Sequence, residues 1–276
     1  MSDRRPISGV RGARMPVLFV GHGSPMNAVE DNAWSRAFRD LAAGLPRPEA
    51  ILAISAHWHV AGTFATSNER PPTIHDFGGF PDELHRVQYP APGSPALARR
   101  AVGLVGDSRA SLREDWGLDH GTWSVLVHLS PGADVPVVQL SIDARLPPAG
   151  HLAIGRALSP LRDEGVLLLA SGNVVHNLGH AFAAARRGDH GTPAWARDLD
   201  EAVAAALVGR DEAFLAGAIS GDASRLAHPT PDHYLPLLYA VGAATPDDEV
   251  RFPITGFDMG SLSMRSVLLG GRHDGT

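Results

Sequence analysis

Cysteine and lysine are both missing from this chain of 276 residues. Without cysteine there can be no thiol nucleophile, disulfide, iron–sulfur cluster or zinc site built from thiolates. Without lysine there can be no Schiff-base lysine and no Walker-type phosphate loop. The chain has 14 histidines instead, so any metal ion must be held by imidazole and carboxylate groups.

Long apolar runs and a surplus of basic residues are missing as well. No run approaches the roughly 18 apolar residues of a membrane helix, and the net charge is −6. We therefore expect neither a membrane nor a nucleic acid as partner. Residues 1–14 contain four arginines and little that is apolar, which indicates a disordered leader on a cytoplasmic protein. Residues 15–276 are expected to form a single catalytic domain, as a monomer or small homo-oligomer.

Short apolar runs alternate with amphipathic stretches along the chain, which favours an α/β fold with a central, largely parallel or mixed sheet and helices on both faces. The predicted strands are Pro16–Val20, Ile51–Ser55, Val135–Ile142 and Val166–Ala170, with a final pair near Val250–Pro253 and Ser261–Leu269. The predicted helices are Ala33–Leu45, Ser94–Val105, Gly150–Leu161, Pro193–Leu207, Asp211–Ile219 and Pro231–Val241. Between them, Gly62–Gly93 is rich in proline, glycine and aromatic residues, and we expect it to form a pocket wall.

Three predicted strands are each followed by a histidine. These are His22, His57 and His176. Ligands of open α/β sheets bind in the crevice at the carboxyl ends of the strands. One such histidine alone would usually cap a turn, but three at corresponding ends predict a shared site, placed at the carboxyl ends of the strands.

The stretch GHGSP, residues 21–25, allows three interpretations. A strand–glycine–helix junction can bind an anion, but this one lacks the usual lysine. Ser24 would be a poor nucleophile, because the G-x-S-x-G order is absent. The third interpretation, favoured here, is that Gly21 and Gly23 bend the backbone so that His22 reaches into a cleft.

Two further clusters contain histidine. In WGLDHGTW, residues 116–123, His120 lies between tryptophans, which is typical of a pocket for a planar substrate and equally of a buried core. In AHPTPDHYLPL, residues 227–237, the intervening prolines prevent one helix from carrying both His228 and His233. Asp232 is a candidate N-cap of the helix that follows.

Weaker substrate-binding candidates are His59, His75, Asp76, Trp116 and Tyr234. His59 could equally make a polar contact at the strand end, and Asp76 a local turn hydrogen bond. Four other histidines, His151, His180, His190 and His273, are expected on the surface.

Seven blocks in order carry a family resemblance. They are GHGSPMNA, SAHW, HDFGGFPDELHRVQYPAPG, WGLDHGTWSVL, PVVQLSID, SGNVVHNLGH and HPTPDHYLPLLYA. Together they resemble the class III extradiol ring-cleaving dioxygenases, and within these the 4,5-DOPA extradiol dioxygenase branch of bacteria and plants. The resemblance extends from Met15 to about Met264.

The resemblance implies a function for five of the histidines. It places the metal ligands on His22, His57 and His233, an acid/base on His176, and a residue that steers dioxygen and substrate on His120. It implies non-haem Fe(II) in the active enzyme, with Zn²⁺ a common occupant after purification.

The implied substrates are O2 and a catechol such as L-DOPA. The implied product is a ring-opened semialdehyde, 4,5-seco-DOPA, which cyclises to betalamic acid. A zinc-dependent hydrolase is the alternative, because three histidines are also the ligand set of zinc hydrolases.

Overall fold

An eight-stranded mixed sheet runs through the centre of the structure, a computed structural model that describes residues 14–189 and 191–270. Its strand order is β4-β3-β5-β2-β6-β1-β10-β7. In chain order these strands are β1 (Val17–Gly21), β2 (Ala50–Val60), β3 (Thr63–Thr66), β4 (Ala110–Arg113), β5 (Val137–Asp143), β6 (Val166–Gly172), β7 (Glu249–Ile254) and β10 (Ser266–Gly270). A separate ribbon pairs β8 (Phe257–Asp258) with β9 (Leu262–Ser263).

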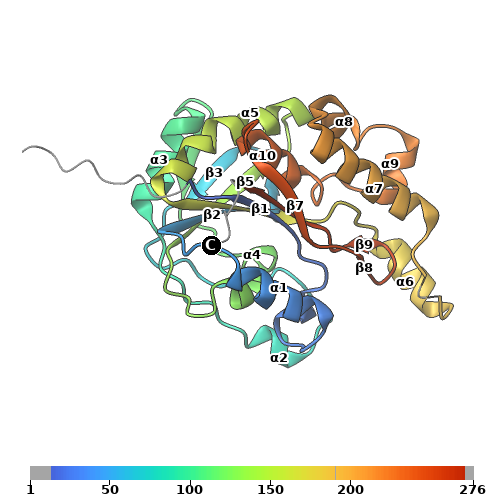
Figure 1. Cartoon of the computed structure of the whole chain (residues 1–276). Helices are drawn as coiled ribbons and strands as arrows, with labels where there is room; N and C mark the ends of the chain where they lie inside the picture. Colours follow the sequence, from blue (N-terminus) through green and yellow to red (C-terminus); the bar gives the residue numbers. More distant parts are fainter. Residues whose placement is uncertain (1–13, 190, 271–276) are drawn as a thin grey trace, which may run out of the picture.

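Helices cover both faces of the sheet (Figure 1). The helices are α1 (Ala33–Ala43), α2 (Asp82–His85), α3 (Pro95–Val105), α4 (His120–Leu129), α5 (Pro148–Leu158), α6 (Leu178–Arg186), α7 (Ala194–Gly209), α8 (Glu212–Gly217), α9 (Asp222–Ala227) and α10 (Leu235–Ala243), with 3-10 turns η1 (Pro25–Ala28) and η2 (Ser159–Glu164). The helices α3, α5 and α10 pack on one face, and α1 and α4 pack on the other. Two apolar cores therefore enclose the sheet, as expected for a buried α/β sheet.

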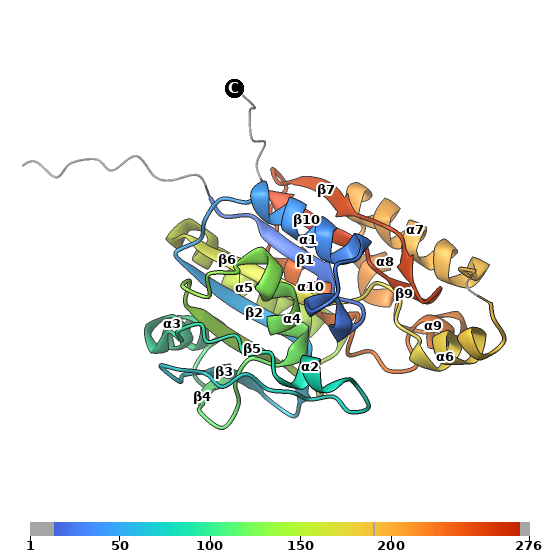
Figure 2. The ribbon, with the colours of Figure 1, turned by 90° about the horizontal axis from the view of Figure 1, so that it is seen from below.

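The four central strands, β5, β2, β6 and β1, are parallel. Each is an almost continuous apolar run, and β1, β5 and β6 are buried throughout. The outer strands β10 and β3 run antiparallel to their central neighbours. The expected fold class is thereby confirmed, and the carboxyl ends of the parallel strands lie at one edge (Figure 2).

A bulge interrupts β2 near its carboxyl end. Ile54 pairs with Leu140, but His59 pairs with Ile142, so five steps along β2 correspond to two along β5. The extra residues, which include His57, leave the ladder. A bulge bends the strand and re-aims its side chains, often beside a functional site. The predicted strand ended at Ser55, so this feature lies beyond it.

Several elements differ from the sequence-based expectation. The stretch expected as a pocket wall contains β3 and α2, and the helices α4, α6 and α9 were not predicted. His151 was expected on the surface but is 1% exposed, because α5 packs against α10 and places His151 Nδ1 3.1 Å from the Tyr239 hydroxyl. Gly23 has the expected positive φ, +63°.

The predicted leader, residues 1–14, falls almost wholly outside the described residues. Its last residue, Arg14, is described, and it donates hydrogen bonds to the Ser159 carbonyl and hydroxyl. Of the four histidines expected on the surface, His190 and His273 also lie outside the described part of the chain. Among the helices that the structure describes, none is both long enough and apolar enough to cross a membrane.

Candidate metal centre

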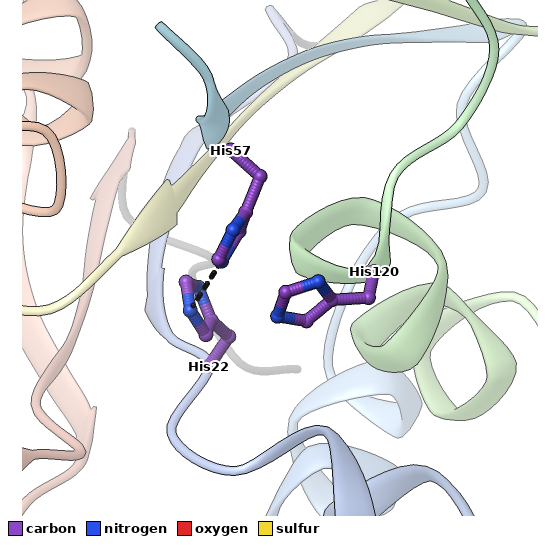
Figure 3. A group of neighbouring side chains, drawn as sticks. All are labelled: His22, His57 and His120. Carbon is purple, nitrogen blue, oxygen red and sulfur yellow. Dashed lines mark hydrogen bonds between the residues drawn. The ribbon is translucent and has the colours of Figure 1, made fainter. Parts of the chain in front are cut away.

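Three histidine side chains meet at the carboxyl edge of the parallel strands. His22 follows β1, His57 lies in the bulge of β2, and His120 is the first residue of α4. One ring nitrogen of each lies within 4.8 Å of the others, and the Nε2 atoms of His22 and His57 are 3.3 Å apart. Figure 3 shows the ring of His120 pointing toward the other two. Nitrogens this close together can share one metal ion.

Two more histidines adjoin this cluster. The ring centroid of His233 lies 5.2 Å from that of His22 and 5.0 Å from that of His57. The ring of His176 stacks on His233, with centroids 3.5 Å apart and planes 3° from parallel. Among the described residues, the closest triad of donors therefore contains His120, while His233, the implied third ligand, lies directly beside it.

The end of β6 positions the backbone of His233. The amide of Asn173 donates to the His233 carbonyl at 2.8 Å. A Cβ atom on Gly172 would lie 2.1 Å from the same carbonyl oxygen, so only glycine permits this approach. A chain segment 60 residues farther on thus reaches the strand ends that carry the other histidines.

Each clustered ring has a polar partner at Nδ1. The Nδ1 of His22 lies 3.0 Å from the Ser171 hydroxyl, and that of His233 lies 2.5 Å from Oδ2 of Asp232. Asp232 does not cap α10, whose first turn lacks a side-chain cap, so the expectation of an N-cap is wrong. Because a hydrogen-bond partner at one nitrogen leaves the other for a metal, these contacts favour Nε2 as the ligand atom.

Asp76 supplies the corresponding partner for the other two rings. Its Oδ2 lies 3.3 Å from Nδ1 of His57, and its Oδ1 lies 3.0 Å from Nδ1 of His120. The Oδ1 atom also accepts the backbone N–H of His120 at 2.9 Å. Burial alone would raise the pKa of Asp76, but hydrogen bonding from His120 and the electrostatic interaction with the imidazoles of His120 and His57 hold it below its usual value.

Burial favours the neutral form of four of these imidazoles, those of His22, His57, His176 and His233. Burial, followed by repulsion from the neighbouring imidazoles, lowers the pKa of His22 and His233 well below the ordinary value. Burial likewise lowers the pKa of His57 to about 3 and that of His176 to about 4. A neutral imidazole has a free lone pair, which is the form that binds a metal. The donor set fits a divalent ion such as iron or zinc, both of which accept imidazole ligands.

The start of α4 is fixed by a buried polar group. Asp119 caps the helix by accepting the N–H of Thr122 at 3.2 Å, and its other oxygen accepts from the side-chain amide of Gln139. Gln139 in turn accepts the backbone N–H of Asp119 at 3.2 Å. Because His120 directly follows this cap, its backbone is anchored to β5 as well as to α4.

The other substrate-binding candidates lie farther from the triad. His75 contacts the Val87 carbonyl through Nε2 at 2.9 Å, and Trp116 stacks on Trp58 with ring centroids 5.5 Å apart. Tyr234 is fully buried and donates its hydroxyl to the Leu215 carbonyl. His59 lies close enough to His151 for its charge to lower the pKa of that residue. The structure therefore brings only Asp76 of these five into contact with the triad.

Two contacts at the site were not expected from the sequence. Phe77 presents its ring edgewise to His120, with centroids 5.3 Å apart. Ser171, expected only as part of a turn, bridges His22 and the Gly121 carbonyl. The single available signal was position in the sequence, since Phe77 follows Asp76 and Ser171 directly follows a predicted strand.

The arrangement is that of a metal-dependent oxidoreductase family. A model of the family described as the catalytic LigB subunit of aromatic ring-opening dioxygenase matches residues 17–261. The chain belongs to this family. Its fold matches what the resemblance implied, and the chain is an extradiol ring-cleaving dioxygenase.

Individual relatives match along nearly their whole length. The chain is 50% identical to the 4,5-DOPA dioxygenase extradiol of Escherichia coli K12, over 93% of this chain and 95% of that protein. It is 36% identical to the protein of the same name from Beta vulgaris, over 90% and 94%. A crystal structure of an uncharacterized protein from Escherichia coli K12 superposes with a TM-score of 0.80 at 46% identity, covering 93% of this chain and all of that one.

Proposed function

We propose that this chain is an Fe(II)-dependent dioxygenase that opens the ring of a catechol, with L-DOPA as substrate. The observation that carries the proposal is the convergence of buried imidazoles, four of which have a polar partner at the outer nitrogen. The L-DOPA assignment is supported by the names of the two relatives above, which are similar to this chain over 90% or more of its length.

In this proposal His22, His57 and His233 hold the iron. His233 is preferred to His120 as third ligand because the family resemblance places the ligand there, and Asp232 contacts its ring in the way that carboxylates contact metal-binding histidines. His120 is then left to face O2 and substrate. When bound, Fe(II) would supply an electron path between the spin-paired catechol and O2, which has two unpaired electrons and reacts only slowly with such a molecule directly.

His176 is the proposed acid/base. Its ring lies against His233, beside the proposed iron position, and is mostly buried. A neutral imidazole there can accept a proton from a catechol hydroxyl and return it during ring opening. The product with L-DOPA is the semialdehyde 4,5-seco-DOPA, whose amine closes on the new carbonyl to give betalamic acid.

Oxygen consumption tests the proposal. The protein is loaded with Fe(II) under anaerobic conditions, mixed with L-DOPA, and exposed to air. The expected result is O2 uptake together with a yellow ring-cleavage chromophore, and neither appears with Zn²⁺ in place of Fe(II). The absence of uptake across a panel of catechols, with zinc-dependent ester or amide hydrolysis instead, would assign the site to a hydrolase.

A further inference from the structure

The loop that carries Asp76 is tied firmly to the region preceding α4. The backbone N–H of Ile74 donates to the Leu118 carbonyl at 2.8 Å, and the N–H of Leu118 donates to the Pro72 carbonyl at 2.9 Å. The indole of Trp123, one turn into α4, donates to the Ile74 carbonyl at 2.8 Å. These bonds hold the backbone just before Asp76 in one place relative to α4.

The carboxylate of Asp76 is fully used by two histidines from different elements. Its side chain is only 17% exposed. One oxygen faces Nδ1 of His57 from the β2 bulge, and the other faces both the backbone N–H and the ring Nδ1 of His120 from α4. The contact with the His120 ring, at 3.0 Å, lies off the ideal hydrogen-bond direction, whereas the backbone N–H of His120 donates to the same oxygen. Both carboxylate oxygens therefore already face an imidazole.

We propose that Asp76 is a positioning residue that keeps His57 and His120 protonated at Nδ1, so that both turn an unprotonated Nε2 toward the metal and substrate. This inference rests on the metal site proposed above, and it replaces the expectation that Asp76 binds substrate. A single carboxylate then ties the orientation of a metal ligand to that of the histidine that faces O2.

The choice of a carboxylate follows from its hydrogen-bonding chemistry. A carboxylate accepts at both oxygens, so both imidazoles can present an N–H to it. An asparagine has one accepting and one donating end. The backbone N–H of His120 requires the accepting end, and the donating amide would then face Nδ1 of His57. His57 would be driven to the tautomer protonated at Nε2, which has no lone pair for the metal.

The Asp76→Asn variant tests this argument through metal binding alone. Metal-free protein is titrated with Zn²⁺ against a competing chelator. We expect an affinity about 10–100-fold weaker than that of the unmodified chain. Asp76→Ala leaves room for water and allows either tautomer of His57. Its Zn²⁺ affinity should therefore be no lower than that of the isosteric Asp76→Asn. Asp82→Asn, an 89% exposed aspartate on α2, is the matched control and should bind Zn²⁺ like the unmodified chain.

The tautomers can also be read directly in the unmodified, metal-free chain. Long-range ¹H–¹⁵N correlation spectra of ¹⁵N-histidine-labelled protein distinguish protonated from unprotonated ring nitrogens. We expect Nδ1 to be protonated in both His57 and His120, and His57 to switch to Nε2 in Asp76→Asn. Protonation of either ring at Nε2 in the unmodified chain would overturn the inference even if Asp76→Asn does not fold. So would unchanged Zn²⁺ affinity in folded Asp76→Asn. Neither readout depends on ring-cleavage activity.

Discussion

The partner at the outer nitrogen, Nδ1, sets the tautomer of an imidazole and so decides whether the inner nitrogen, Nε2, has a free lone pair. Ser171 serves His22, Asp232 serves His233, and Asp76 serves the other two members of the cluster. Two of these partners are carboxylates, which also raise the basicity of the rings they contact. A divalent ion held by neutral ligands would therefore be balanced by negative charge one layer farther out.

His176 and His233 form a matched pair for separating acid/base catalysis from metal binding. The rings are stacked and chemically identical, yet the proposal gives them different tasks. His176→Ala should lower turnover of the catechol about 10²–10⁴-fold, the usual contribution of a general acid or base, while keeping most of the metal. His233→Ala should lose the metal itself.

Metal content by elemental analysis and O2 uptake on the same preparations distinguish these outcomes. If His176→Ala also loses its metal, His176 is a ligand and the proton must be handled elsewhere. If His233→Ala retains full metal, the triad of His22, His57 and His120 is the binding set.

The sequence could predict the histidines better than their partners. His22, His57 and His176 follow apolar runs, and the crevice at strand ends brings such residues together whatever lies between them. Asp76 and Asp232 act through tertiary contacts that no local pattern encodes. Asp232 was interpreted as a helix cap because capping is the local use of aspartate, and a long-range contact with the neighbouring ring prevails instead.

At the scale of elements, the site depends on how closely α4 approaches β2. A Cβ atom on Gly121 would lie 2.5 Å from Oγ of Ser55 and 2.7 Å from Cδ2 of His57. The helix can therefore begin next to the bulge only because residue 121 lacks a side chain. This contact sets the separation between His120 and His57.

Gly121→Ala should accordingly damage the metal site before it damages the fold. The added methyl group must push α4 away from β2 or displace the His57 ring, and we expect Zn²⁺ affinity to fall at least 10-fold, as when a supporting contact is lost. Zinc titration with thermal unfolding of the same samples checks this. Gly103→Ala is the control, because that exposed position in α3 has open space. It should raise stability by about 0.5–1 kcal/mol and leave Zn²⁺ binding unchanged.

Elements were predictable where periodicity was strong. The runs that became β1 and β6 are almost wholly apolar. Ser94 caps α3 by accepting the N–H of Leu97, as the Ser-Pro pair indicates. The helix α4 was missed because its first turn, HGTW, is buried and has no polar face. The bulge in β2 was missed because it reflects pairing with β5 rather than any local signal.

At the scale of the whole molecule, one buried ion pair joins distant segments. The guanidinium of Arg162 is fully buried and donates to the carbonyls of Met15 and Ala243 as well as to both oxygens of Asp248. It thereby links the segment leading into β1, the end of α10 and the residue before β7. None of these segments contains a site residue, so the pair should affect stability without affecting chemistry.

Asp248→Asn should lower the free energy of unfolding by about 3–5 kcal/mol, because it leaves the buried Arg162 charge without its counter-ion. Urea unfolding at pH 7 measures this. Glu164→Gln breaks the pair between Arg100 and Glu164, whose side chains are 48% and 41% exposed, and should cost less than about 1 kcal/mol. Equal losses in the two variants would contradict a structural role for the buried pair.

The same pair predicts how stability depends on pH. Burial alone would raise the pKa of Asp248, but hydrogen bonds from Arg162 and Thr245 hold it below the ordinary value. Because the folded pKa is the lower one, the unfolded chain binds the proton first as the pH falls. The stabilisation contributed by ionised Asp248 is therefore complete above the ordinary aspartate pKa of about 4. It declines as the pH drops through the lower pKa that Asp248 has in the folded protein. Unfolding free energies measured from pH 7 to pH 3 should fall less steeply in Asp248→Asn than in the unmodified chain, whereas parallel curves would assign the acid sensitivity to other carboxylates.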